Sequence, residues 1–587
     1  MSSQNGGRLA GEAFITHRPK NIERGVLVVL LEAFTPSTNP LGHQWASALV
    51  ALIPIACMLI TLGALRWKAH WAGLASWALA LVVAITAYHM PVTMAVSSSV
   101  EGFLYGLFPI GWILLAAIWM YQVTVISGRF DDLRRTFFLI SDDPRVLGIL
   151  IAFCFGGLLE ALAGFGAPVA IAAAMLIAVG FGKLRAAVTA LVANTVPVAF
   201  GAVGLPVLMA ARTGGLEVSQ VAPVTARICA ILCLVVPFLM LGIMDGRQGI
   251  KQCWPFGLFV GFIFGAVKWI VAGTGLYNLT EIFAAVISVG LAMVFLRFWK
   301  PRGGAEAAER IGIPMDPSLE TGPAGRTEEG GDKLTAGRIV MALVPYILVI
   351  VIFGIAAVPS VQALLKKADV KMAWPGLGEL LSTTGKASAH QSYTWPWLST
   401  PGFLLLIVAL LVGIIYRVSI RDLFGELLVN LKKMKFSLIT IGLVVALAYV
   451  MGDSGQTMAL GLFIAGAGAV YPFLAPILGW IGTYVTGSDT SANILFSGLQ
   501  SGIGEQIGDP ANLEAMRSLL VGSGAAGGVV GKMISPQSLT VAATAIGLAG
   551  GESTILRKVF KYSIVLIVFM CIIAGLMSTP VLGWLLP

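Results

Sequence analysis

Apolar stretches of about 20 residues recur along almost the whole chain, and a helix of that length spans the hydrocarbon core of a bilayer. This feature limits the fold more than any other. Only 11% of the 587 residues are charged and 57% are hydrophobic, whereas a soluble domain carries about 25% charged residues. Strands of a membrane β-barrel would instead be alternating segments of roughly 10 residues. The sequence therefore predicts an all-α polytopic membrane protein with about 12–14 transmembrane helices.

A polar loop at 301–336, rich in glycine, proline and charge, divides the apolar stretches into two groups and is expected to be a flexible cytoplasmic linker. The chain then consists of a polar N-terminal tail (1–45), a first membrane repeat (46–300), this linker and a second membrane repeat (337–587). The expected membrane segments are 47–66, 71–90, 102–126, 146–181, 186–212, 222–244, 254–273, 279–298, 337–358, 402–418, 436–452, 456–486, 489–506, 515–546 and 560–582.

Basic residues lie mainly in short loops between the apolar segments, as the positive-inside rule expects of cytoplasmic loops. The net charge of +9 is therefore not interpreted as a nucleic-acid-binding surface. The alternation of basic and neutral loops predicts that the N-terminus lies outside the cell. Lys268 and Glu281 lie near the ends of predicted spans and are expected to snorkel towards the membrane surface.

No metal, cofactor or catalytic site is predicted. The six cysteines are scattered, and Cys229 and Cys233 share a helix face without a histidine or carboxylate beside them, so core positions are expected. The five histidines are not clustered. The sequence contains neither an H-E-x-x-H motif nor a phosphate-binding G-x-x-x-x-G-K-[ST] motif. An enzyme or an ATP-driven pump is therefore not supported.

Four segments interrupt the apolar helices, two in each half of the chain. They are LLEALAGFGAPVAI (158–171), ANTVPVAFGAVGLPV (193–207), TGSDTSANILFSGLQ (486–500) and GSGAAGGVVGKMISPQSL (522–539). The structures that they predict are a hairpin, a broken helix, a second hairpin and a second broken helix, at 146–181, 186–212, 456–506 and 515–546. Backbone freed at membrane depth must line a cavity or be buried by protein, and corresponding breaks in two halves are typical of a transporter binding site. A channel would instead need a continuous polar pore.

Such a site suits a small anion. Helix N-termini at the breaks offer unpaired N–H groups and the positive end of a dipole to a carboxylate. The hydroxyls of TGSDTS can donate to a carboxylate or a hydroxyl, and a lysine nearby supplies positive charge. The candidate substrate-binding residues are Gly164, Gly166, Ala167, Asn194, Thr195, Thr486, Ser488, Thr490, Ser491, Lys532, Ser535 and Gln537.

The polar residues at the breaks also have structural interpretations. Glu160 could hold the hairpin tip by bonding to freed backbone, or it could carry a proton, because an ionisable group at membrane depth is expensive and is functional by default. Asp489 could cap the outgoing helix or bind an ion or a proton. Lys532 could snorkel or pair with an acid, and Asn194 and Thr195 could serve only the broken helix.

These segments resemble motifs of the lactate permease family. The resemblance extends to YGLFPIGWILLAAIWMY (105–121) and IMDGRQGIKQCWP (243–255), and it covers the chain from about residue 43 to the C-terminus. It implies a secondary carrier of the bacterial plasma membrane that imports L-lactate, and also D-lactate and glycolate, by proton symport. It further implies two inverted repeats with re-entrant hairpins, elevator-type movement and assembly as a homodimer.

On this resemblance, the first hairpin tip receives the carboxylate of a 2-hydroxy acid, and Glu160 and Asp489 are the candidate carriers of the proton. Import of the anion alone would be opposed by about 2.3 kcal/mol per 100 mV of membrane potential, and one proton for each anion cancels that charge. The alternative is a sodium-coupled carrier of another small carboxylate, because hydroxyls and freed carbonyls can also coordinate Na⁺. The expected partners are thus a small monocarboxylate, a proton and membrane lipid.

Overall fold

The computed structural model is built almost entirely of helices and confirms the all-α polytopic architecture. In its first half the elements are α1 (Gln44–Leu59), α2 (Ala69–Thr86), α3 (Val92–Tyr105), η2 (Gly106–Gly111), α4 (Trp112–Ile126), α5 (Arg129–Phe138), α6 (Pro144–Ile149), η3 (Leu150–Phe155), α7 (Gly156–Ala163), α8 (Ala167–Val179), α9 (Lys183–Ala193), η4 (Val198–Phe200), α10 (Gly201–Thr213), α11 (Val218–Ala272), η5 (Tyr277–Leu279), α12 (Thr280–Phe298) and α13 (Gly304–Ile311). In its second half they are α14 (Ala336–Ala357), α15 (Pro359–Lys367), β1 (Val370–Ala373), η7 (Ala389–Gln391), β2 (Ser392–Trp395), α16 (Pro401–Ile415), α17 (Ile420–Asp453), α18 (Gln456–Ala465), η8 (Gly468–Val470), α19 (Tyr471–Thr486), α20 (Asp489–Ile507), α21 (Leu513–Lys532), α22 (Pro536–Ala545), α23 (Glu552–Met577) and η9 (Gly583–Leu585). The structure describes residues 33–61, 65, 67–138, 140–163, 167–312, 335–382, 385, 387–510, 512–548 and 551–586.

Helices long and apolar enough to cross a membrane number ten among the described residues, or eleven when the bent pair α9–α10 is counted as one span. The 55-residue α11 would be about 80 Å long if straight, far more than a bilayer core of about 30 Å. It is instead two antiparallel legs that join at Asp245 and Gly246, where the backbone leaves the helical region. A side-chain carbon on Gly265 would lie 2.8 Å from the Ala230 carbonyl, so this glycine lets the legs touch. The two predicted segments 222–244 and 254–273 are therefore both present.

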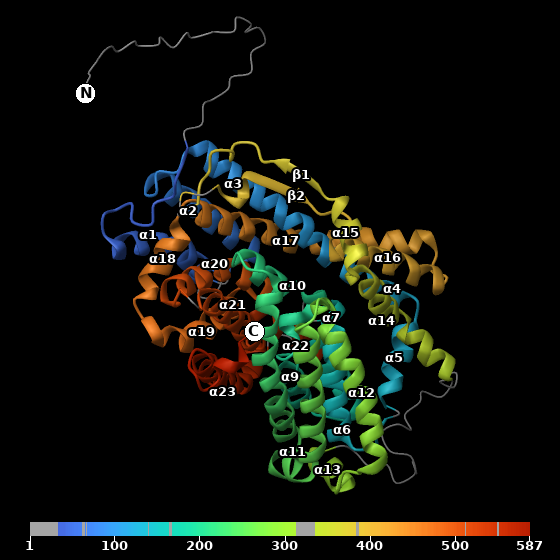
Figure 1. Ribbon diagram of the computed structural model, residues 1–587. Helices are drawn as coiled ribbons and strands as arrows, with labels where there is room; N and C mark the ends of the chain where they lie inside the picture. Colours follow the sequence, from blue (N-terminus) through green and yellow to red (C-terminus); the bar gives the residue numbers. More distant parts are fainter. Residues whose placement is uncertain are drawn as a thin grey trace, which may run out of the picture.

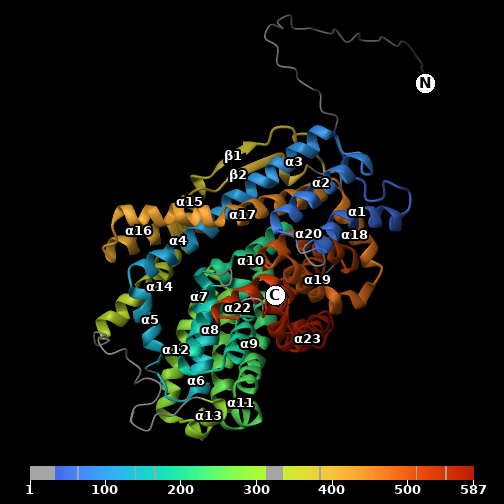
Figure 2. The ribbon, with the colours of Figure 1, turned by 180° about the vertical axis from the view of Figure 1, so that it is seen from behind.

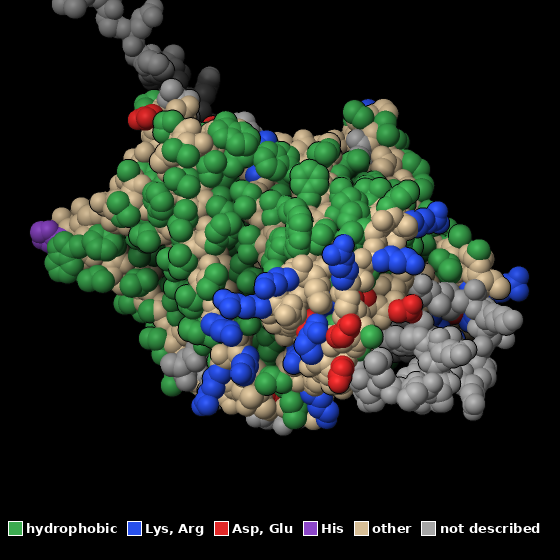
Figure 3. All heavy atoms as spheres, turned by 90° about the horizontal axis from the view of Figure 1, so that it is seen from below, with side chains coloured by type: hydrophobic (Ala, Val, Ile, Leu, Met, Phe, Trp, Pro, Cys, Tyr) green, Lys and Arg blue, Asp and Glu red, His purple; other side chains and the backbone are tan. Residues whose placement is uncertain are grey.

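The long oblique helices α3 and α17 form one layer with α2 and α16 (Figures 1 and 2). Beneath this layer, α10 lies at the centre, and α7, α9, α11 and α12 extend away from it. The C-terminal helices α19, α21 and α23 pack together at one side. The lower end of the molecule, where α13 and the bend of α11 lie, bears many lysine and arginine side chains next to a broad hydrophobic surface (Figure 3).

Helix α13 lies within the predicted linker 301–336, so the first part of that linker is folded. Its Arg310 pairs with Asp245 at 2.8 Å, and Ala307 is fully buried. These contacts fix α13 against the bend of α11. The rest of the linker, from 313 to 334, lies outside the described residues.

Each half contains a helical hairpin. In the first, η3 and α7 pack against α8, and its tip at 164–166 lies outside the described residues. In the second, α19 and α20 are joined by Gly487 and Ser488, and Gly487 has a φ of +75°. The predicted first leg of this hairpin, 456–486, is shorter than expected. It is divided into α18 and α19 at Gly468, whose φ of +55° suits glycine in particular.

The predicted broken helix at 186–212 is confirmed: α9 and the segment that contains α10 meet at an angle of 59°. Straight after the break, Ala202, Val203 and Gly204 all have positive φ, with values of 44°, 59° and 76°. A β-branched residue in the left-handed region is a backbone outlier, and each such residue costs about 1–3 kcal/mol. The fold therefore holds this turn in place against its local preference.

The predicted second broken helix at 515–546 is interrupted after its glycine-rich run and not within it. Helix α21 continues to Lys532, and the interruption lies at 533–535, before α22. The glycines instead form a contact surface for α19. A side-chain carbon on Gly527 would overlap the backbone of Pro476, and one on Gly531 would overlap the backbone of Trp480. Small residues thus let membrane helices approach closely.

The segment between α14 and α16 covers the end of the molecule opposite α13 (Figures 1 and 2). It contains the antiparallel pair β1–β2, and a parallel bridge joins Phe34 to Leu380. Part of the predicted N-terminal tail is therefore structured.

His390 fixes this segment to α17. Its Nδ1 lies 2.7 Å from Oδ1 of Asp453, and its ring stacks on Tyr449 with the centroids 4.2 Å apart. Burial alone would lower the pKa of His390, but the carboxylates of Asp453 and Glu101 raise it to about 9. The ring therefore carries a positive charge at neutral pH.

Candidate functional site

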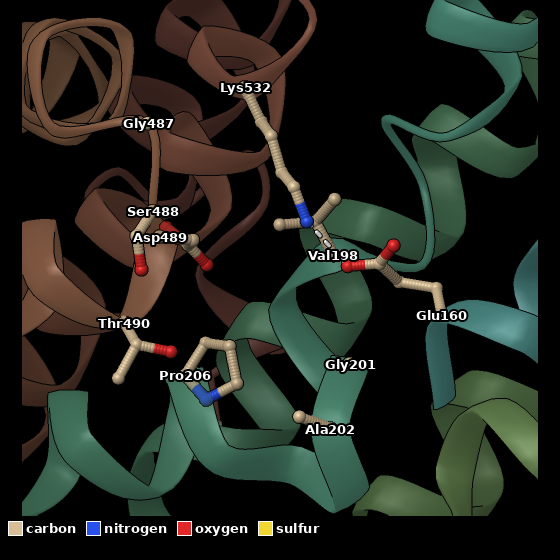
Figure 4. Close-up of a pocket in the computed structure, with 10 residues that line it drawn as sticks. All are labelled: Glu160, Val198, Gly201, Ala202, Pro206, Gly487, Ser488, Asp489, Thr490 and Lys532. Atoms are coloured by element: carbon tan, nitrogen blue, oxygen red, sulfur yellow. Dashed lines mark hydrogen bonds and ion pairs between the residues drawn. The ribbon is translucent and has the colours of Figure 1, made fainter. Parts of the chain in front are cut away.

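A small polar pocket lies where the second hairpin tip meets the broken helix (Figure 4). The lining residues come from α7, η4, α10, the α19–α20 turn, the start of α20 and the end of α21. They are Glu160, Val198, Gly201, Ala202, Pro206, Gly487, Ser488, Asp489, Thr490 and Lys532. The cavity volume is about 30 Å³, which is room for about two water molecules.

An ion pair between the two halves of the chain closes one side of the pocket. Lys532 extends from the end of α21 towards Glu160 on α7 (Figure 4), and Nζ lies 2.5 Å from Oε1. The side chains are 9% and 2% exposed, so both charges are largely withdrawn from water. The second carboxylate oxygen, Oε2 of Glu160, has no hydrogen-bond partner among the described residues. Of the interpretations left open for Lys532, pairing with an acid is the one that the geometry shows.

Asp489 forms the opposite side of the pocket. It is the first residue of α20, and the residue that caps this helix is Ser488, whose hydroxyl accepts from the Ser491 N–H. The capping interpretation of Asp489 is therefore wrong: the serine before it already has the capping geometry. Oδ1 of Asp489 accepts from the Thr483 hydroxyl at 3.3 Å, and Oδ2 has no partner among the described residues. A side-chain carbon on Gly528 would overlap Oδ1, so this glycine makes room for the carboxylate.

Among the predicted substrate-binding residues, Ser488, Thr490 and Lys532 line the pocket together with Glu160 and Asp489. The remaining predicted residues of the second half lie around it. The Thr486 hydroxyl donates within its own turn, to the Gly482 carbonyl at 2.8 Å or to the Ser488 carbonyl at 3.0 Å.

Ser535 caps α22 by accepting from the Ser538 N–H, and its own hydroxyl donates to the Lys532 carbonyl at 3.0 Å. Gln537 packs against the hairpin tip, because a side-chain carbon on Gly487 would lie 2.6 Å from its Oε1. Both residues therefore support the pocket from behind its lining.

The first-half candidates do not line the described pocket. Asn194 ends α9, and its Oδ1 is buried without a partner among the described residues. The Thr195 hydroxyl, just beyond α9, lies 3.5 Å from the Leu191 carbonyl of that helix. Gly164 and Gly166 lie outside the described residues, as does the side chain of Ala167. Their proposed contact with a ligand stays a prediction.

Five lining residues were not predicted individually: Val198, Gly201, Ala202, Pro206 and Gly487. They lie within or beside the interrupted segments, but their side chains carry no polar group that could single them out. Gly201 is required by space, since a side-chain carbon there would lie 3.0 Å from Oε1 of Glu160. The glycine and proline pattern indicates the interrupted segments. Which of their residues face the cavity depends on the three-dimensional packing.

A second buried ion pair lies behind the broken helix. Lys268 and Glu281 are both fully buried and form a salt bridge with each other, so the prediction that they snorkel to the surface is wrong. Nζ of Lys268 also donates to the Val196 carbonyl at 2.7 Å. This carbonyl belongs to the break between α9 and η4, so the lysine satisfies backbone that the break has freed.

The sequence model of the L-lactate permease family matches residues 47–581. The chain is 36% identical to the glycolate permease of Escherichia coli (strain K12) over 91% of this chain and 96% of that protein. It is 35% identical to the L-lactate permease of Bacillus subtilis (strain 168), over 95% of this chain and 99% of that protein. These relatives are permeases of bacteria, and with the apolar helices they identify a multi-pass transporter of a bacterial plasma membrane. The chain belongs to the L-lactate permease family.

Proposed function

We propose that this protein transports lactate and glycolate, both small 2-hydroxy monocarboxylates, together with a proton. The relatives named above are permeases for L-lactate and glycolate. The observation that carries the mechanism is the Lys532–Glu160 ion pair inside the pocket. A carboxylate ligand and Glu160 are chemically equivalent partners for the same ammonium group, so they compete for it.

Exchange of this partner couples the anion to the proton. When Glu160 accepts a proton, Lys532 loses its counter-ion and is left as a buried, unpaired charge, which is costly. The substrate carboxylate restores the pair. Conversely, an anion that enters without a proton would add a third carboxylate to Glu160 and Asp489 in a pocket lined by one lysine. Because either half-step is unfavourable alone, one anion and one proton bind together, and the net charge of the site does not change.

The pocket also offers a hydrogen-bond acceptor for the 2-hydroxyl group of the substrate. Thr490 and Asp489 lie across the cavity from Lys532 (Figure 4), and Oδ2 of Asp489 has no partner among the described residues. It can accept a hydrogen bond from the 2-hydroxyl group of the substrate. A cavity of about 30 Å³ is smaller than lactate, so binding requires the Lys532–Glu160 pair to separate and the pocket to widen.

Proton coupling fits this pocket better than sodium coupling does. A bound Na⁺ would share the cavity with the ammonium group of Lys532, and like charges repel strongly where water is excluded. We further propose that the two halves (46–300 and 337–587) are inverted repeats, each contributing one hairpin and one broken helix, and that these elements move together relative to the α3–α17 layer.

The test is uptake of labelled L-lactate into proteoliposomes under an imposed pH gradient, with choline replacing sodium. We expect accumulation that follows the pH gradient and does not need sodium. In Glu160→Gln, pH-driven accumulation should be lost, whereas the matched control Glu505→Gln, at an exposed position of α20, should behave as the wild type. Accumulation that ignores the pH gradient in the wild type, or that persists in Glu160→Gln, would refute the coupling scheme.

A further inference from the structure

Arg212 lies in the last turn of α10, the helix that also provides Ala202 and Pro206 to the pocket. It is six residues beyond Pro206, which corresponds to roughly 9 Å along a helix. The side chain is exposed to solvent. According to the predicted orientation, α10 ends on the outer side of the membrane. A permanent positive charge therefore stands between the outer solution and the substrate pocket.

No carboxylate is paired with Arg212 among the described residues. Its hydrogen bond goes to the hydroxyl of Tyr105 at the end of α3, and its guanidinium carbon lies 6.0 Å from the centre of that ring. A guanidinium group has five N–H donors arranged in a fork that fits a carboxylate. Most of these donors therefore remain available to a ligand from solution.

Further tyrosines lie near this arginine. Tyr277 on η5 and Tyr449 on α17 lie within its electrostatic reach, and the Tyr105 and Tyr449 rings are 5.9 Å apart. We call Arg212, Tyr105, Tyr277 and Tyr449 the arginine–tyrosine cluster. Its charge is positive and its neutral neighbours can donate hydrogen bonds, a combination that suits a small anion bearing a carboxylate and a hydroxyl.

Two acids lie near the cluster, and their cationic neighbour is His390 and not Arg212. His390 pairs with Asp453, and the Ser98 hydroxyl donates to the other oxygen of Asp453 at 2.6 Å. Glu101 is buried close by. These acids act electrostatically on Tyr449, but neither of them bonds to Arg212. They repel an anion that approaches α3 and leave the guanidinium as the attractive group.

We propose that the arginine–tyrosine cluster is a second binding site for the substrate carboxylate, which captures the anion from one side of the membrane before it moves along α10 to the Lys532 pocket. This inference rests on the proposed function, because its ligand is the carboxylate of that function. Arg212 binds the carboxylate bidentately, and the tyrosine hydroxyls bind the 2-hydroxyl group. The site acts on one face only, since Lys532 alone serves the other.

The test compares L-lactate uptake in right-side-out and inside-out membrane vesicles. In Arg212→Gln, KM should rise about tenfold in one vesicle orientation, as expected for the loss of a charge-assisted hydrogen bond. KM in the other orientation should stay close to wild type. Without an imposed gradient, Vmax/KM must stay equal in the two directions, so in that other orientation the change should fall on Vmax. Tyr105→Phe should raise the same one-sided KM about threefold, because it removes a neutral hydrogen bond, and Arg212→Lys should recover part of the Arg212→Gln loss.

The control is Arg227→Gln. Arg227 also has no acidic partner among the described residues, but it donates to the Leu585 carbonyl and stacks over Trp269, away from the cluster. Its substitution should leave KM unchanged in both orientations. An Arg212→Gln variant with unchanged KM, or with KM raised equally on both sides, would overturn this inference while leaving wild-type transport and the proposed function intact. A wild-type protein that carries no lactate would overturn the proposed function itself.

Discussion

The Glu160–Lys532 pair should have a characteristic signature in a double-mutant cycle. Breaking a buried ion pair by removing one partner costs about 3–5 kcal/mol, because the other charge stays buried and unpaired. The Lys532 side chain is 9% exposed and its partner is 2% exposed, so we take the lower end of this range, about 3 kcal/mol. Lys532→Met and Glu160→Gln should each destabilise the protein by that amount at pH 7.

The double variant Glu160→Gln/Lys532→Met should be much more stable than the sum of the single losses predicts, because neither Glu160 nor Lys532 is then left as a charge without its partner. The destabilisation of Lys532→Met alone should shrink as the pH falls, since protonation removes the stranded carboxylate charge. The assay is unfolding of the purified protein in detergent, followed by tryptophan fluorescence, with uptake measured in parallel. All three variants should lose pH-driven accumulation. Additive losses in the cycle would refute the conclusion that the two charges stabilise each other.

Three further outcomes can be measured. Gly528→Ala should abolish uptake, because the added carbon would overlap the carboxylate of Asp489. The control Gly425→Ala, where no heavy atom lies within 4 Å of the added carbon, should leave stability unchanged or raise it by up to about 1 kcal/mol. Equal behaviour of the two variants would contradict the packing argument. Lys268→Met should destabilise the protein by about 3 kcal/mol and raise KM for lactate, because a buried acid and a carbonyl of the broken helix lose their partner; an unchanged thermal midpoint would contradict this role. The pKa of His390 in the folded protein is raised from 6.5 to about 9. Its bond to Asp453 should therefore stabilise the protein fully below pH 6.5 and progressively less as the pH rises through about 9. In His390→Gln, this pH dependence of the melting temperature should disappear.

The sequence was sufficient to predict the fold class, because apolar length alone demands membrane helices. It also located the pocket, because glycine and proline at membrane depth are expensive unless they line a cavity. Glu160 and Lys532 were each singled out as charges in apolar runs. That they meet depends on how two distant parts of the chain pack, and no local pattern in a single sequence encodes this.

Two features depend on packing that the sequence does not show. The segment 522–539 predicts a broken helix, but a glycine run has the same appearance whether it interrupts a helix or lets another helix, here α19, come close. Lys268 and Glu281 lie close to the ends of predicted spans, and this position suggests that their side chains reach the membrane surface. Both side chains instead face the protein interior. Lys268 binds the Val196 carbonyl, which is free because the helix is broken between α9 and η4.

The glycine contact between α19 and α21 has a mechanical consequence for the pocket. Because backbone touches backbone along this contact, α19 and α21 are held close together, and the α19–α20 turn before Asp489 stays near the end of α21 that bears Lys532. The side of the pocket that Asp489 and Lys532 form is therefore stiff. The volume needed to admit an anion must come from movement of the opposite side, formed by Glu160 and the strained left-handed turn at Ala202, Val203 and Gly204.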